Sequence, residues 1–500
     1  LDYLHKEREE ILKGGIEEIG PWLVLLYNVK RIYKKANFTE TGLGFYLSVF
    51  ENFSSNTDLN HFKNIIEGDL ESLKTHLKNA ISKLNQTRHL SDLLYDNDKA
   101  LFAASRIIET SYSNKDVESF LLSMMVKSDF SLIFKSKESQ EFSSFGDTGN
   151  EKEDIENIYN YIDKNSDLIS QDDNSQYVWV AVTEGQLFQL SLYNKEFEFT
   201  YLKDWNWEKF KKLNQLEYFT NLRFRETTKD HNGVRQISKE EYEEQMDNII
   251  SEVDFGKLDI KKNADSIYLV KDMELAIFPN NLFMMEDNFI HQKKTITNIL
   301  STEWYISHKQ QSELNKCFTK SIWIPKKEGN FTINQLYGTL ENILKENDFN
   351  EFTSANLENP LSSDINIVCS HGSKDIANKQ VLYPNNSPLF NHDNIIGNGQ
   401  ILIFFVCHSG SYKTEYLRNN INSIVKSYIS AGYESVIAPF WSLHVNIPKI
   451  WLPTFLKSIK DGNPLDIALF EANQSLYKKY PTPSAFCDMH LYGNPHLKIK

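Results

Sequence analysis

Residues 365–374 read INIVCSHGSK and residues 401–410 read ILIFFVCHSG, and these two stretches decide the fold. Each opens with a short apolar run and delivers a reactive side chain as the run ends, His371 in the first and Cys407 in the second. Short runs that are apolar on both faces are typical of strands in a parallel sheet that helices cover on both sides. We therefore predict two buried strands with His371 and Cys407 at their carboxyl ends.

Two further apolar runs extend this pattern, SIWIP at 321–325 and SVIAPF at 435–440. Stretches with apolar residues every three or four positions separate the runs, as expected of helices that cover a sheet. The alternation predicts an α/β fold with a mostly parallel open sheet flanked by helices. Functional residues of such sheets gather at the carboxyl ends of the strands. The helices are predicted at 333–347, 416–432, 447–462 and 464–477.

The N-terminal part of the chain has a different pattern. Residues 1–135 are predicted to be helical, most clearly over 62–84, and a later stretch predicts a helix pair that breaks at Ser113-Asn114. We therefore expect an all-α N-terminal domain that precedes the sheet. Residues 136–175 are rich in Ser, Asp and Asn and indicate a polar linker that holds one short helix near 155–162.

The region after the linker adds more strands. The runs YVWVAVT and QLFQLSLY, separated by EGQ, predict a β-hairpin, and SIYLV at 266–270 predicts another strand. We divide the chain into a helical domain at 1–135, a linker at 136–175, a first part of the sheet region at 176–315 and a second part at 316–500.

The composition excludes several classes of protein. The net charge of −14 and the pI near 5.5 argue against direct binding of nucleic acid, because phosphate binding needs clustered Lys and Arg. Four scattered cysteines without a CxxC pair predict a reducing compartment, and no apolar run approaches the roughly 18 residues of a membrane span. The start of the chain lacks a signal-peptide core, so we expect a cytoplasmic protein. The first residue is Leu1 rather than Met, which leaves open whether residues precede it.

His371 and Cys407 have the chemistry that a cysteine peptidase needs. Such an enzyme combines a thiolate, an imidazole that moves the proton, and two donors for the developing oxyanion. Gly372 follows His371 and lets backbone approach a substrate carbonyl without a Cβ in the way. We predict that His371 and Cys407 form a catalytic dyad and that the N–H groups of Gly372 and Cys407 form the oxyanion hole.

Plainer interpretations of these residues stay open. A free cysteine most often packs in a core, and a histidine at a strand end is often hydrogen-bonded only to backbone. Cys369, inside its strand, is expected in the core, and His408 is expected to leave the strand on the face opposite Cys407. Three further histidines rank below His371 as the base: His444, His490 and His496.

A phosphate-binding loop is a weaker alternative for CHSGSYK. Cysteine phosphatases place Arg six residues after the cysteine, and here that position is Lys413, which lacks the planar fork of a guanidinium. The sequence holds no GxGxxG or GxxxxGK[ST] motif and no metal-ligand spacing, so it predicts neither a nucleotide nor a metal cofactor.

A set of motifs in a fixed order resembles the CHAT family of caspase-like peptidases. The set comprises SHGS at 370–373, FFVCHSG at 404–410, SAGYESVIAPFWSL at 430–443, DGNPLDIALFEANQSLY at 461–477 and LYGNPHLKI at 491–499. The resemblance covers roughly 176–500 and is strongest over 266–500. It implies a caspase-like fold with His371 and Cys407 as the dyad and with no metal or organic cofactor.

The resemblance also implies a function. Members of the family act as selective endopeptidases in bacterial immune or signalling pathways, are activated by a sensor or partner, and in some cases cleave a pore-forming effector. The N-terminal helices are then expected to bind the regulatory partner. A catalytically silent caspase-like scaffold that binds proteins is the alternative.

The resemblance also bears on the preferred cleavage site. Related metacaspases and paracaspases carry an Asp two residues before the cysteine, where this chain has Phe405. We therefore expect no strong preference for Arg or Lys at the cleaved bond, and a pocket that favours an apolar residue and is walled by Phe405, Trp441 and Ser442.

Overall fold

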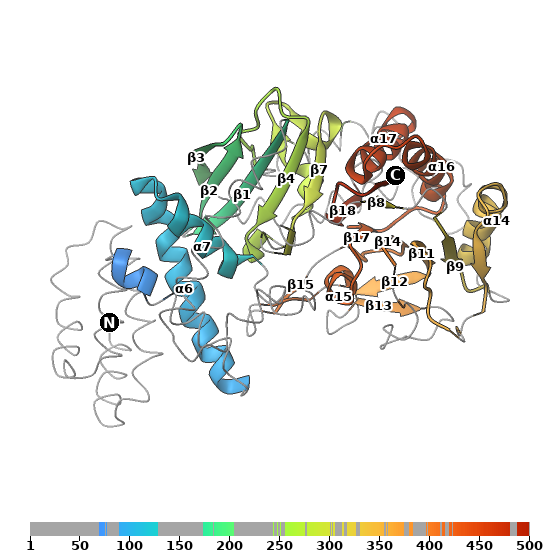
Figure 1. The fold of residues 1–500 in the computed structure, drawn as a ribbon, viewed down its shortest axis with the longest axis horizontal. Coiled ribbons are helices and arrows are strands. Elements are labelled where there is room, and N and C mark those ends of the chain that lie inside the picture. The colour runs from blue at the N-terminus through green and yellow to red at the C-terminus, as the bar shows by residue number, and fades with distance from the viewer. Residues whose placement is uncertain are drawn as a thin grey trace.

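The computed structural model has helices at the N-terminal side and one long mixed sheet (Figure 1). Of the predicted helix at 62–84, only residues 70–75 and 77 are described, and they are helical, whereas the linker at 136–175, except its last two residues, and the short helix near 155–162 lie outside the described residues. The described residues are 70–75, 77, 90–128, 174–183, 185–204, 244, 248, 251, 256–275, 278–300, 302, 304–305, 313–314, 318–326, 331–354, 357, 359–374, 380–383, 397, 399–410, 413–415, 420–422, 424–480 and 488–499.

Two helices form the described end of the N-terminal region, α6 (Leu90–Asn114) and α7 (Val117–Lys127). The predicted break at Ser113-Asn114 is confirmed within two residues. Asp116 caps α7, because its carboxylate accepts the backbone N–H of Ser119 at 3.1 Å. Nearly every residue of α7 after its first turn is buried, and α6 contacts β1, β2 and β3. Both helices therefore pack against the sheet.

The main sheet has eleven strands in the order β10-β9-β11-β14-β17-β18-β7-β4-β1-β2-β3. Its strands, in chain order, are β1 (Ser175–Thr183), β2 (Gln186–Tyr193), β3 (Glu196–Asp204), β4 (Ser266–Lys271), β7 (Thr295–Asn298), β9 (Lys320–Trp323), β10 (Asn350–Phe352), β11 (Ile365–Cys369), β14 (Ile401–Phe405), β17 (Ser435–Pro439) and β18 (Met489–Gly493).

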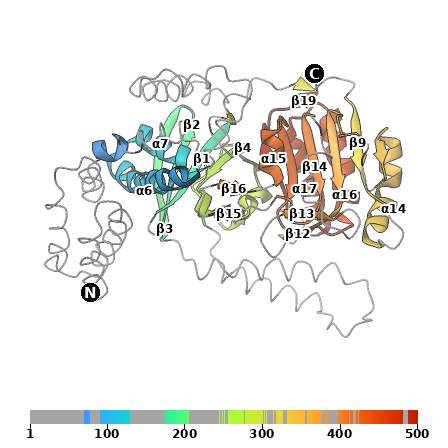
Figure 2. The ribbon, with the colours of Figure 1, turned by 90° about the horizontal axis from the view of Figure 1, so that it is seen from below.

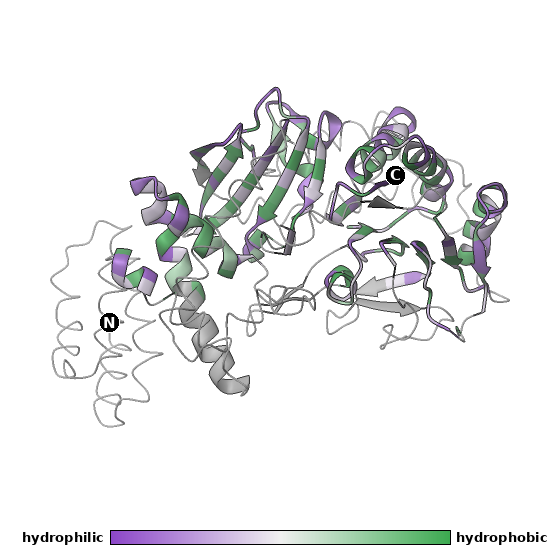
Figure 3. Ribbon diagram, viewed as in Figure 1, coloured by the Kyte–Doolittle hydropathy of each residue, from purple (hydrophilic) through white to green (hydrophobic). Residues whose placement is uncertain are grey.

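The predicted parallel strands are confirmed in one half of this sheet. β10, β9, β11, β14 and β17 are parallel neighbours, and the described residues of β9, β11, β14 and β17 are almost all buried. Every residue of β11, β14 and β17 is buried, including the polar Asn366 and Ser435, and Figure 3 shows both hydrophobic and hydrophilic parts on the neighbouring helices α16 and α17. Burial on both faces removes the need for alternating polar residues, which explains the continuous apolar runs.

Four helices accompany these strands: α14 (Phe331–Glu346), α15 (Ile424–Ser430), α16 (Ile447–Lys460) and α17 (Leu465–Lys479). Three of the predicted helices are confirmed, but the helix predicted at 416–432 is wrong at 420–422. These residues form β16 (Asn420–Asn422), which pairs antiparallel with β15 (Lys413–Glu415), and the described helical residues begin at Ile424. Consecutive Asn residues at 419–420 are poor helix formers, which fits the later start.

The second half of the sheet contains the predicted hairpin. β1 and β2 pair antiparallel from Thr183↔Gln186 to Tyr177↔Leu192, β3 adds to β2, and β4 and β7 continue beside β1 in parallel. β18 joins the halves, because it pairs with β17 over five residues and with β7 over two. The strands of the two halves run in clearly different directions (Figures 1 and 2).

One continuous cluster of buried apolar side chains extends through both halves. It includes Ile108 and Phe120 of the helices, Val178 of β1, Ile403 of β14 and Leu491 of β18. The domain boundary predicted at 315–316 stays a prediction, although the core and the sheet cross it without a break. A shared core of this kind favours folding as one unit.

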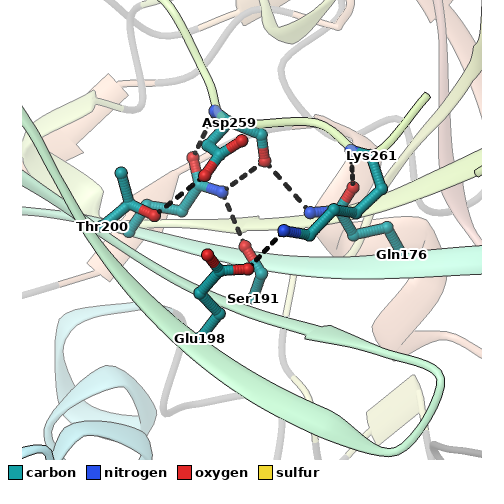
Figure 4. Close-up of polar contacts among 7 residues, drawn as sticks. Gln176, Ser191, Glu198, Thr200, Asp259 and Lys261 are labelled. Atoms are coloured by element: carbon teal, nitrogen blue, oxygen red, sulfur yellow. Dashed lines mark hydrogen bonds and ion pairs between the residues drawn. The ribbon is translucent and has the colours of Figure 1, made fainter.

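Two glutamines on the outer strands hold a returning segment of chain (Figure 4). Gln189 on β2 donates to the carbonyl of Asp259 at 2.7 Å and accepts its N–H at 3.0 Å. Gln176 on β1 also donates to that carbonyl, at 3.0 Å, and accepts the N–H of Lys261 at 2.8 Å. Both glutamines are buried, and these bonds satisfy their amides while fixing the chain that leads into β4.

A buried ion pair attaches α7 to the sheet. The ammonium of Lys127 lies 3.0 Å from the carboxylate of Asp272, and both side chains are 2% exposed. Burial alone would lower the pKa of Lys127, but the charges of Asp272 and Glu274 outweigh burial and raise it. Lys127 therefore keeps its charge, and the ion pair links the N-terminal helices to the end of β4.

No helix in the described part of the chain combines the length and the apolar character that a membrane span requires.

Candidate active site

The two strands that carry the candidate dyad are direct neighbours. β11 and β14 pair in parallel from Ile365↔Ile401 to Cys369↔Phe405. His371 and Cys407 each follow the last pair by two residues, so they leave the same edge of the sheet at the same level. The expected position at the carboxyl ends of adjacent strands is therefore present in the fold.

The backbone around His371 touches the backbone around Cys407. A Cβ placed on Gly372 would overlap the carbonyl oxygen of Cys407, and it would lie only 2.6 Å from Cγ1 of Val406. Both of these atoms belong to the end of β14. Residue 372 must therefore be glycine for the chain that carries the imidazole to approach the chain that carries the thiol.

The two reactive side chains are partly accessible. His371 is half-buried and Cys407 is of intermediate exposure. Burial lowers the pKa of His371 from its ordinary value of 6.5, so the ring is neutral at pH 7 and able to accept a proton. By contrast, Cys369 is fully buried inside β11, and burial raises the pKa of its thiol well above the ordinary value. Of these two cysteines, only Cys407 has the access that a nucleophile needs.

A tight turn follows Cys407. His408 has a φ of +60°, in the left-handed region, and its N–H donates to the carbonyl of Trp441 at 2.8 Å. The hydroxyl of Ser409 donates to the carbonyl of Val406 at 2.8 Å, and the N–H of Gly410 donates to Pro439 at 2.8 Å. The chain thus turns immediately after the cysteine, which leaves the partly exposed Cys407 two residues beyond the end of β14.

The segment after β17 lies against this turn. The sulfur of Cys407 lies 3.9 Å from the carbonyl oxygen of Leu443, and the hydroxyl of Ser442 lies 3.1 Å from Nε2 of His408. The ring of His408 therefore contacts Ser442. His444 is partly buried, which lowers its pKa, and its Nδ1 accepts the N–H of Asn446 at 3.3 Å.

The three residues expected to wall the substrate pocket differ in exposure. Phe405 is 2% exposed and meets Trp451 of α16 edge-on, with ring centroids 6.0 Å apart. Trp441 is 4% exposed, whereas Ser442 is partly exposed. Burial of this degree favours a packing role for the two aromatic rings, so Ser442 is the better placed of the three to meet a substrate.

The remaining candidates from the sequence lie elsewhere. His490 is fully buried in β18, and His496 accepts or donates a hydrogen bond with the hydroxyl of Tyr305 at 2.7 Å. Lys413 begins β15, so residues 407–410 and 413–415, the described part of this segment, do not form the helix N-terminus that holds phosphate in phosphatase loops. In the described ranges no group of three or more His, Cys, Asp or Glu side chains is arranged to hold a metal ion.

Two residues near the site were missed by the sequence analysis. Asp488 accepts the N–H of Trp441 at 2.7 Å, and the hydroxyl of Tyr492 donates to the carbonyl of Gly410 at 2.8 Å. Both come from β18 or the residue before it. The run MHLYG at 489–493 could have revealed this strand. Five residues with one polar side chain among them are too few to distinguish a strand from a loop by their pattern.

Comparisons with known proteins give a structural similarity alone. No protein-family model and no curated protein sequence matches the chain. The crystal structure of the Saccharomyces cerevisiae separase–securin complex at 2.6 Å matches with a TM-score of 0.52 and 11% sequence identity, over 86% of this chain and 38% of that chain. A structure of the same complex at 3.0 Å gives a TM-score of 0.49 and 11% identity, over 86% and 37% of the two chains.

These findings define the class of fold. The chain has a mixed, mostly parallel sheet with flanking helices of the separase type, which is the fold of the caspase-like proteases. The chain spans little more than a third of the length of the matched separase chain. At 11% identity the similarity extends to the fold and stops there.

Proposed function

We propose that the chain is a caspase-like cysteine endopeptidase of the CHAT type. The observation that carries the proposal is the contact between Gly372 and Cys407, since it brings two strand ends with a partly exposed thiol and a neutral imidazole to one place. The fold supports the proposal because it is one on which proteases are built.

In this mechanism the thiol of Cys407 transfers its proton to the imidazole of His371 and attacks the scissile carbonyl. The new C–S bond places negative charge on the carbonyl oxygen, which the N–H groups of Gly372 and Cys407 stabilise. When the C–N bond breaks, the imidazolium of His371 gives its proton to the departing amine. Water, deprotonated by the same imidazole, then hydrolyses the thioester and regenerates the thiol.

The site also suggests a preference at the cleaved bond. The position two residues before Cys407 is Phe405, whose ring packs against α16, so no carboxylate is available there for a basic side chain. The preferred residue is therefore neither Arg nor Lys. Ser442, next to the cysteine turn, contacts the substrate in this proposal.

The biological setting comes from the resemblance of the motifs. The substrate is a specific protein, such as a pore-forming effector, in a bacterial immune or signalling pathway within the cytoplasm. A sensor or regulatory protein binds the N-terminal helical region and activates cleavage. Helices α6 and α7 pack on β1, and α6 also contacts β2 and β3, so a partner bound to these helices would act on the sheet through them.

The experiment compares the wild type with Cys407→Ala, each expressed as the full chain in the same cells. New protein N-termini are mapped by mass spectrometry. We expect cleavage products that depend on Cys407 and that persist in the Cys369→Ala control. Equal products from wild type and Cys407→Ala, or none from either, would leave the scaffold as the remaining function.

A further inference from the structure

Strand β18 approaches the candidate cysteine from within the sheet. Tyr492 in β18 and Asp488 just before it are both fully buried, and each has a polar atom within hydrogen-bond distance of backbone near Cys407. Neither side chain belongs to the predicted dyad or pocket. Their contacts are with the two backbone segments that surround the thiol.

Tyr492 holds the turn that follows Cys407. Its hydroxyl donates to the carbonyl of Gly410 at 2.8 Å, while the N–H of Gly410 donates to Pro439 at 2.8 Å. A Cβ on Gly410 would lie 2.8 Å from the carbonyl oxygen of Ala438 and 3.1 Å from the hydroxyl of Tyr492. The turn is therefore pressed against β17 and β18 and has little room to shift.

Asp488 holds the segment that faces the turn. Its carboxylate accepts the N–H of Trp441 at 2.7 Å, and its own carbonyl accepts the N–H of Phe440 at 2.9 Å. The carbonyl of Trp441 in turn accepts the N–H of His408 at 2.8 Å. A continuous series of hydrogen bonds therefore runs from Asp488 to the residue directly after the cysteine.

This support matters because the backbone at His408 is in an unfavourable conformation. A residue with a side chain in the left-handed region costs roughly 1 kcal/mol or more relative to ordinary backbone, and surrounding contacts must maintain it. The turn begins directly after Cys407, so a shift of the turn would carry the thiol of Cys407 with it. Errors of about 1 Å in such positions lower catalytic rates by roughly a hundredfold.

We propose that Asp488 and Tyr492 are positioning residues that set the geometry of Cys407 through the turn at 408–410 and the segment at 440–441. The inference rests on the proposed function, since it concerns the orientation of the same nucleophile. The two side chains act through backbone and touch no substrate. We call the pair, with these two residues as its members, the β18 brace.

The test uses the reactivity of the thiol, which can be measured without knowing the substrate. The full chain is treated with iodoacetamide between pH 5 and 10, and mass spectrometry of the Cys407 peptide gives the alkylation rate. We expect Tyr492→Phe to lower the rate at pH 7 by roughly tenfold and to displace the pH midpoint, because the turn moves relative to the imidazole.

Tyr433→Phe is the matched control. Tyr433 is also buried, its hydroxyl accepts a hydrogen bond from Asn366 at 2.9 Å, and it lies at the opposite end of β17. This variant loses a comparable buried bond, so its thermal midpoint should fall in a similar way while its alkylation rate stays within about twofold of the wild type. Equal rates and pH profiles for Tyr492→Phe and Tyr433→Phe would overturn the β18 brace.

Asp488 is tested by two variants. Asp488→Asn keeps an acceptor for the N–H of Trp441 and should retain a rate within about threefold of the wild type, whereas Asp488→Ala should lose roughly tenfold or more. If Asp488→Ala does not fold, the comparison of the two tyrosine variants decides. Failure of the proposed function would appear separately, as missing Cys407-dependent cleavage by the wild type, because alkylation rates report the turn whether or not a peptide bond is cut.

Discussion

The α-carbon of Gly372 lies directly against the carbonyl group of Cys407, although 34 residues of chain separate the two. The contact follows from the parallel register of β11 and β14, which ends at Cys369↔Phe405 and lets both chains continue side by side. A thiol and an imidazole exchange a proton when their side chains come within hydrogen-bond reach, and neighbouring strand ends make this possible.

Replacing Gly372 by Ala should disable the site. The new methyl group would overlap the carbonyl oxygen of Cys407 and crowd Val406, so one of the two strand ends must move. We expect a loss of Cys407-dependent cleavage of roughly a hundredfold or more, with a stability loss of about 1–3 kcal/mol. Product formation and denaturant unfolding measure the two effects.

Gly338→Ala provides the control for that variant. Gly338 lies inside α14, and a Cβ there meets nothing within 4 Å. Alanine should therefore stabilise the protein by roughly 0.5–1 kcal/mol and leave cleavage unchanged. Wild-type activity in Gly372→Ala would show that the strand ends need not approach each other.

The cysteines at 407 and 369 should differ strongly in reactivity. Cys407 is partly exposed, and its backbone contacts Gly372, the residue after His371. Cys369 is fully buried, and burial raises the pKa of its thiol. Iodoacetamide at pH 8 should alkylate Cys407 faster by roughly a hundredfold or more in the folded protein. Peptide mass spectrometry resolves the two sites, and comparable rates in the native state would contradict the assigned positions.

Asp466 should make stability depend on pH. Its carboxylate is buried near the start of α17 and accepts hydroxyl hydrogen bonds from Ser266 at 2.9 Å and Thr295 at 3.2 Å. Burial raises the pKa of Asp466 from 3.8 to about 6 in the folded protein. The native state therefore binds this proton more tightly than the unfolded state, and stability from this group is lost as the pH rises from about 4 to 6.

Asp466→Asn removes the ionisation and keeps the shape. The difference in unfolding free energy between variant and wild type should shift in favour of the variant by about 3 kcal/mol between pH 4 and pH 7, from roughly two pKa units at 1.36 kcal/mol each. Urea unfolding at several pH values gives this difference directly. A difference that is constant with pH would show that Asp466 ionises freely.

Lys127 should be essential to the attachment of α7. Its ammonium is buried with Asp272 and also donates to the hydroxyl of Ser105 at 2.9 Å. Lys127→Met leaves the carboxylate of Asp272 buried without its cation, which should cost about 3–5 kcal/mol of unfolding free energy. Adding Asp272→Asn should restore part of the loss, since the uncompensated charge is then removed.

The exposed pair of Lys345 and Glu341 on α14 is the control for that comparison. Its atoms are 2.9 Å apart, but both side chains are largely in solvent. Lys345→Met should leave the unfolding midpoint nearly unchanged, because exposed ion pairs contribute little. A similar effect of Lys127→Met and Lys345→Met would mean that water reaches the pair at Lys127.

Local sequence patterns correctly predicted the strands that consist of consecutive, mostly apolar residues. The runs at 365–369 and 401–405 have no polar alternation to confuse their assignment, and both are strands. The break after Asn114 was also predictable from its polar residues. The short strands β7 and β18 were not, since a few residues with a Thr, Asn or His among them carry no clear period.

The sequence alone determined that this chain has buried parallel strands that end two residues before His371 and Cys407, because short apolar runs have a simple physical cause in burial on both faces. It could not determine which strands are neighbours, because pairing joins residues far apart in the chain and depends on the whole sheet. Only the tertiary structure placed Gly372 against Cys407 and brought Asp488 and Tyr492 beneath the turn. Those contacts arise where β18 inserts between β17 and β7, a position that no local pattern specifies.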